Sequence, residues 1–183
     1  KMGTSSKELA RKLRALAAKQ HGCFTAAQAV ETGYADSVHL YHVKNGKWIR
    51  VFRGVYRFAD LPATPEARCM AALLWTRDKN GKIQGFLPAE TAEKLRSGTF
   101  PAEKPVRVLV PRGFRRSSEA PEGIEIEIFA SKTHKTSKMD GLTFLAEPPQ
   151  ASARPSRAPE TPLDAPDYYD WLDYQAVLCE KTS

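Results

Sequence analysis

The sequence predicts an α+β protein, and three observations support this class. Ser/Thr-x-x-Glu/Gln patterns that begin at Ser5 and Thr25 each precede a run with apolar residues at helical spacing. Residues 48–58 place aromatic and aliphatic residues on both sides of an Arg-Gly pair, as a β-hairpin does. Residues 106–110 and 124–129 alternate valine or isoleucine with other residues, which is typical of strands. With 183 residues, 42% of them hydrophobic, the chain is long enough for one domain or two small ones.

The two capped patterns predict two helices near the N-terminus. The first helix is expected to begin after Ser5 and to end at Gly22. The second is expected to begin after Thr25 and to end after about two turns at Gly33. In each helix, a Glu or Gln three residues after the cap completes the predicted capping box.

A third, shorter helix is predicted before the hairpin. Asp36 or Ser37 is expected to cap it, and Gly46 to end it. Its inward-facing residues are expected to be Leu40 and Val43, because they are three positions apart and apolar.

The predicted hairpin follows directly and completes a recognisable order of elements. Residues 48–52 form the first strand, Arg53-Gly54 the turn and residues 55–58 the return strand. Helix, helix, turn, helix and a two-stranded wing is the order of a winged helix-turn-helix. In that geometry the third helix enters a major groove and the wing lies along the phosphates.

The positive charge is concentrated in this part of the chain. Residues 1–59 hold 11 Lys and Arg and 3 Asp and Glu, whereas residues 60–183 hold 17 and 18. Residues 37–58 contain lysines and arginines but no acid, which favours phosphates as their partners. The residues predicted to contact double-stranded DNA are Ser37, His39, Tyr41, His42, Lys44, Lys47, Arg50, Arg53 and Arg57. The wing is expected to supply affinity, and the third helix a modest sequence preference, because its one full cation is Lys44.

Two histidines in the third helix also raise the question of a metal site. His39 and His42 share a helical face, as two ligands would. No third ligand stands at a useful spacing, so we predict neither a metal nor any other cofactor.

Residues 61–147 are predicted to form a second, small α+β domain after the winged helix-turn-helix of residues 1–60. Thr64 and Pro65 open a helix with a buried apolar face, and a shorter helix is expected over residues 89–96. The strands at 106–110 and 124–129 supply a small sheet.

A catalytic role for this second domain is an alternative. Glu125, Glu127 and Lys132 loosely match the acidic-x-Lys core of metal-dependent nucleases. The two glutamates alternate as an exposed strand face requires, and Lys132 is too distant for that motif. We therefore predict that the protein has no catalytic residues and is not an enzyme.

The C-terminal residues 148–183 combine a linker with an acidic, aromatic segment. Residues 147–166 are rich in Pro, Ala and Ser. Residues 167–179 carry aromatic and aliphatic side chains at helical intervals. They are expected to form a short helix docked on folded protein, either the same chain or a neighbouring copy.

The sequence also favours a location in the cytoplasm and no membrane partner. There is no uninterrupted apolar run of the length of a membrane span and no signal peptide at the start of the chain. The three cysteines are far apart and form no CxxC pair, which favours reduced thiols.

Residues 9–58 resemble the N-terminal domain of AbiEi-type antitoxins from type IV toxin–antitoxin systems of bacterial abortive infection. The specific part runs from Tyr41-His42-Val43 through Trp48 and Arg53-Gly54 to Tyr56-Arg57. The resemblance implies a winged-helix repressor that binds repeats in the promoter of its own operon. It also implies that a nucleotidyltransferase-like toxin is countered without a stable complex between toxin and antitoxin.

Two alternatives stay open at this point. One is a nuclease that uses the winged helix to dock on nucleic acid. The other is a stand-alone regulator whose second domain binds a protein.

Overall fold

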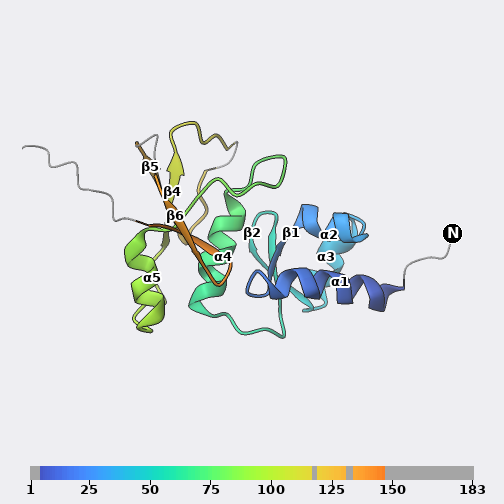
Figure 1. The fold of residues 1–183 in the computed structure, drawn as a ribbon. Helices are drawn as coiled ribbons and strands as arrows, with labels where there is room; N and C mark the ends of the chain where they lie inside the picture. Colours follow the sequence, from blue (N-terminus) through green and yellow to red (C-terminus); the bar gives the residue numbers. More distant parts are fainter. Residues whose placement is uncertain (1–4, 117–118, 131–133, 147–183) are drawn as a thin grey trace, which may run out of the picture. The chain divides into compact units, whose positions relative to one another are not determined.

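The computed structural model describes residues 5–116, 119–130 and 134–146, all of which belong to one compact unit (Figure 1). The predicted linker and C-terminal helix lie outside these residues. The first elements along the chain are α1 (Ser6–Ala18), β1 (Cys23–Thr25), α2 (Ala26–Thr32), α3 (Val38–Lys44), β2 (Trp48–Phe52) and β3 (Val55–Phe58). Their order confirms the predicted α+β class and the N-terminal winged helix-turn-helix.

The two capping predictions have different outcomes. Thr25 and Gln28 form the predicted capping box: Gln28 N donates to Thr25 Oγ1 at 3.2 Å, and Thr25 N donates to Gln28 Oε1 at 2.9 Å. The predicted box at Ser5 is wrong, because Ser5 makes no side-chain hydrogen bond to the helix. Glu8 pairs instead with Lys12, with Oε1 and Nζ 3.4 Å apart. The second helix ends as expected at Gly33, whose φ of 112° favours glycine.

The wing belongs to a three-stranded sheet with the order β1-β3-β2. Strand β1 was not predicted; it pairs antiparallel with β3, with Phe24 opposite Tyr56. One face of this sheet packs against α1 and α2 in a core of Leu13, Ala17, Phe24, Ala29, Tyr34, Trp48, Tyr56 and Phe58. The opposite face contributes Cys23 and Val55 to a second core. Strand β3 is therefore buried on both faces.

The remaining elements form a second sheet with helices. They are α4 (Pro65–Trp75), α5 (Ala89–Arg96), β4 (Val106–Pro111), β5 (Ile124–Phe129), β6 (Thr136–Met139) and β7 (Leu142–Leu145). Thr64 caps α4 as predicted, because its Oγ1 accepts from Ala67 N at 3.1 Å. Strands β4 and β5 confirm the two predicted strands and pair parallel. The β6–β7 hairpin was not predicted.

A short segment joins the two pairs of strands. Phe86 pairs with Leu109 of β4, and Leu87 pairs with Phe144 of β7. The backbone hydrogen bonds of these two bridges connect β5, β4, the segment at 86–87, β7 and β6 in that order.

Helix α4 contacts both sheets, as its central place in Figure 1 shows. It touches all three strands of the wing sheet, and it also touches β4 and β7. Residues from Cys69 to Trp75 are all buried, so the helix is covered around its whole circumference. The division into domains after residue 60 stays a prediction. No helix in the described ranges is long and apolar enough to span a membrane.

Candidate nucleic-acid interface

Aromatic rings hold α3 against the wing sheet. The imidazole of His42 stacks on the indole of Trp48, and the ring of His39 lies 5.6 Å from the same indole between centroids. Tyr34 approaches Trp48 from the loop before α3 at 5.2 Å. The helix is only seven residues long, so these contacts rather than its own hydrogen bonds fix its position.

The inward face of α3 differs from the predicted one. Val43 packs against the core as expected, but Leu40 is 61% exposed. The residue buried in its place is His39, at 4% exposure. A two-turn helix can turn either of two faces towards the core, the one with His39 and His42 or the one with Leu40. Stacking on Trp48 favours the histidines.

Most of the predicted DNA-contacting residues lie on the surface of α3 and the wing. The exposed ones are Ser37, Tyr41, Lys44, Lys47, Arg50 and Arg53. His42 is half-buried, and its Nδ1 atom is buried without a hydrogen-bond partner among the described residues. His39 and Arg57 lie in the interior. At 4% and 9% exposure, these two side chains pack inside the fold.

Arg57 is buried because α4 covers the back of the wing. Strand residues alternate between faces, so Arg57 shares the face of Val55, which packs in the core with α4. Its guanidinium donates to the carbonyl oxygens of Phe58, at 3.3 Å, and of Leu61. Sequence analysis does not predict this cover, because it places the helix that follows Thr64 in the second domain.

The exposed cations of α3 and the wing form no ion pairs among the described residues, unlike Arg107 in the second sheet. Within the described residues, none of Lys44, Lys47, Arg50 and Arg53 forms an ion pair. By contrast, Arg107 in the second sheet is paired with two glutamates. Cations that have no acid nearby are available to neutralise phosphates.

An acid, Asp36, stands just before the N-terminus of α3 in the sequence. Its carboxylate lies 3.9 Å from Nδ1 of His39 and is 85% exposed. It stands before the N-terminus of the helix, away from the wing in sequence. No Asp or Glu stands between Ser37 and Arg53 in the sequence, so the Lys and Arg side chains of this stretch have no acid within it.

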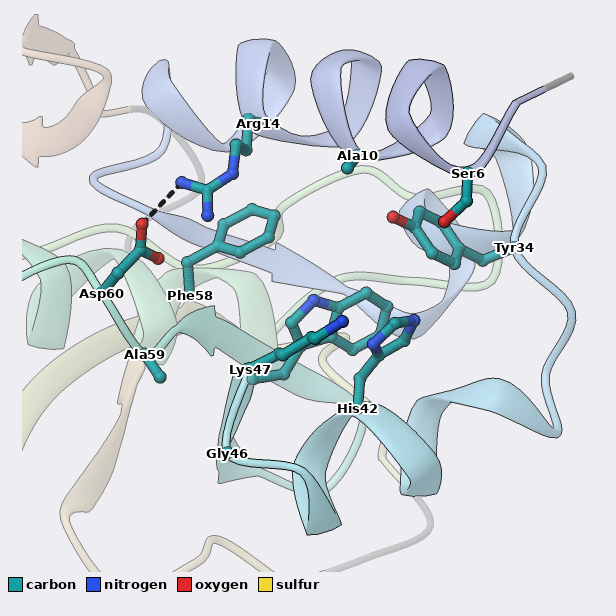
Figure 2. A pocket seen from close by; sticks show the side chains of 11 residues that line it. Ser6, Ala10, Arg14, Tyr34, His42, Gly46, Lys47, Phe58, Ala59 and Asp60 are labelled. Carbon is teal, nitrogen blue, oxygen red and sulfur yellow. Dashed lines mark hydrogen bonds and ion pairs between the residues drawn. The ribbon is translucent and has the colours of Figure 1, made fainter.

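A cavity of about 450 Å³ lies between α1 and the end of α3 (Figure 2). Figure 2 shows Arg14 pointing from α1 towards Asp60, and the two side chains form an ion pair at 2.8 Å. The guanidinium of Arg14 also lies over the ring of Phe58, 4.5 Å from its centroid. His42 and Lys47 line the cavity from the α3 side. Arg14 is therefore already engaged, whereas Lys47 is not.

The second sheet carries no arrangement that resembles a catalytic centre in its described part. Glu127 accepts a hydrogen bond from Nε of Arg107 at 2.6 Å, and Glu90 lies 3.4 Å from the same guanidinium. No group of three or more His, Cys, Asp or Glu that could hold a metal is found among the described residues. Lys132 lies outside them.

One surface residue was missed by the sequence reasoning. Leu40 lies on the exposed face of α3, beside the predicted Tyr41. A leucine at helical spacing predicts burial, so no local signal indicated that it would face outward.

Comparison with known protein families finds a match in the N-terminal part. Residues 11–59 match the model of a family described as transcriptional regulator, AbiEi antitoxin. The match covers most of α1 and continues through β3, which is the winged helix-turn-helix. No curated protein matches the chain.

Proposed function

We propose that this protein is a DNA-binding transcriptional regulator that acts as the antitoxin of a type IV toxin–antitoxin system. In this role it binds repeats in the promoter of its own operon and represses it, in the bacterial cytoplasm. The family match over residues 11–59 supports the regulator and antitoxin classes. The proposal includes no enzymatic activity and no stable complex with the toxin.

The observation that carries the DNA-binding part is the unpaired charge on α3 and the wing. Lys44, Lys47, Arg50 and Arg53 are exposed and lack acidic partners among the described residues. We assign the phosphate contacts to these cations and the contacts to bases to the outer face of α3. His39 and Arg57 are left out of this set because they are buried.

The test is the salt dependence of binding to the DNA upstream of the gene. Overlapping duplexes of that region are titrated with protein at several salt concentrations, and fluorescence anisotropy gives the affinity. Arg53→Ala should weaken binding to every duplex and lower the salt slope by about one unit, as for one lost phosphate contact.

Arg107→Ala is the matched control, because it removes the same charge from a residue that is paired with Glu90 and Glu127. It should leave the slope unchanged. Equal slopes for wild type, Arg53→Ala and Arg107→Ala would refute the assignment of the wing. Absence of binding to any upstream duplex would refute the DNA-binding role.

The antitoxin part has a separate test in cells. Expression of a neighbouring nucleotidyltransferase-like gene should arrest growth, and co-expression of this protein should restore it. Affinity purification of either protein should not retain the other. Failure to restore growth, in a strain that still shows promoter repression, would reduce the proposal to a stand-alone regulator.

A further inference from the structure

The exposed face of α3 is apolar at its centre. Ser37, Leu40, Tyr41 and Lys44 are all exposed, and their spacing places them on one side of the helix. Leu40 and Tyr41, in the middle of this face, are 61% and 57% exposed. A polar side chain thus stands at each end and two large apolar groups stand between them.

Burial along α3 is the opposite of what side-chain polarity favours, because a histidine is buried and a leucine is exposed. His39 is buried with its Nε2 atom unpaired, while a leucine next to it is left in solvent. Exposed leucine contributes nothing to the core, and a buried imidazole without a partner is unfavourable. Among the described residues Leu40 is left 61% exposed, so its side chain is available to a binding partner.

The charge around this face identifies the class of partner. Lys44 lies on this face, Lys47, Arg50 and Arg53 are exposed on the residues that follow it, and no Asp or Glu stands between Ser37 and Arg53 in the sequence. A second protein surface would have to be strongly acidic to match these cations, whereas DNA supplies a phosphate on both sides of a groove. We take DNA as the occupant.

The floor of the major groove has one apolar feature. Guanine, cytosine and adenine present hydrogen-bond donors and acceptors, and thymine adds a C5 methyl group. The leucine and tyrosine at the centre of this face cannot form the bidentate hydrogen bonds that read guanine or adenine. It can bury a methyl group.

We propose that α3 recognises thymine methyl groups in the major groove and that Leu40 makes the main contact. Tyr41 borders the same methyl or its neighbour through its ring. This inference rests on the proposed DNA-binding function and adds the chemical feature that is read. It also accounts for sequence preference in a recognition helix without an arginine.

The test replaces thymine by deoxyuridine, which removes the C5 methyl and preserves base pairing. Each thymine of the upstream duplex that binds most tightly is replaced in turn. At one or two positions, wild-type affinity should fall by about fourfold, the effect of about one buried methyl group.

The second part of the test combines the Leu40→Ala variant with the same thymine and deoxyuridine duplexes. This variant should bind thymine-containing DNA more weakly and no longer distinguish thymine from deoxyuridine at those positions. The matched control is Ile128→Ala, since Ile128 is also exposed, at 64%, but lies on β5. It should keep the full difference. Both variants should melt at the wild-type temperature, because neither side chain is buried.

Three outcomes would overturn the inference. If every deoxyuridine duplex binds as tightly as its parent, the methyl groups are not read. If Leu40→Ala retains the thymine preference, Leu40 is not the reader. If wild type self-associates without DNA and Leu40→Ala does not, the face is an interface between copies. Absence of binding to all duplexes would refute the proposed function together with this inference.

Discussion

The imidazole of His42 stacks on the indole of Trp48, with centroids 4.5 Å apart and planes inclined by 28°. The stack joins α3 to β2, the first strand of the wing. Burial lowers the pKa of His42 below its usual 6.5, and the charges of Lys47 and His39 lower it further. The fold therefore favours the neutral ring.

The first prediction concerns pH. Because the pKa of His42 is lower in the folded state than in the unfolded state, its contribution to stability is fully present above about pH 6.5. That contribution is lost as the pH falls from 6.5 through the lower, folded pKa. Urea unfolding at pH 7.5 and pH 5.5 should show the loss. His42→Phe keeps a ring against Trp48 but binds no proton, so it should reduce the difference between the two pH values.

A matched histidine is available as the control. His134 stacks on Phe86, with centroids 4.6 Å apart, but it is exposed. His134→Phe should leave the pH dependence as in wild type. An unchanged pH dependence in His42→Phe would show that this ring is not responsible.

The second prediction separates two arginines of the wing. Arg57→Ala should lower the free energy of unfolding by about 1–3 kcal/mol, because it removes charge-assisted hydrogen bonds to the carbonyls of Phe58 and Leu61. It should leave the salt slope of DNA binding unchanged. Arg53→Ala should show the opposite pair of effects. Chemical denaturation and anisotropy on the same preparations decide between the roles, and a stable Arg57→Ala with a reduced slope would contradict them.

The third prediction concerns thiol reactivity. Burial raises the pKa of both Cys23 and Cys69 to about 12, and Cys23 Sγ donates to the carbonyl of Ala67 at 3.3 Å. Almost no thiolate is present at pH 8, so both should resist iodoacetamide until the protein unfolds. Mass spectrometry of a Cys179→Ser variant, with and without urea, measures this directly. Rapid native labelling of either thiol would mean that α4 separates readily from the wing sheet.

The fourth prediction is that purified protein cleaves neither plasmid DNA nor RNA with magnesium or manganese. Glu127 is engaged by Arg107, and the hydrogen bond between them raises the pKa of Arg107. Glu127→Gln should change the free energy of unfolding by no more than about 1 kcal/mol, because the pair is exposed. Metal-dependent cleavage that disappears in Glu127→Gln would instead support the nuclease alternative.

The sequence predicted best those elements whose signals are local. The capping box of Thr25 and Gln28 needs groups only three residues apart, so its residues alone reveal it. The hairpin turn at Arg53-Gly54 is equally local. Strand β1 was missed because its three residues are fixed by pairing with β3, which lies far along the chain.

The candidate site was predicted less completely for the same physical reason. Exposure of Lys47, Arg50 and Arg53 follows from charge, and the structure agrees with it. Burial of Arg57 depends on a helix that follows the wing, and the orientation of Leu40 depends on the stacking of histidines against Trp48. Neither contact is visible in the spacing of residues within α3 or β3.

Because α4 covers the back of the wing sheet, the winged helix-turn-helix cannot be transplanted as residues 1–60 alone. A chimera cut there would bare Cys23 and Val55, which are now buried. A chimera that continues through Trp75 would keep that cover but bare the side of α4 that packs on β4 and β7. A working graft therefore needs polar replacements on that side of the helix, because apolar surface left open promotes aggregation.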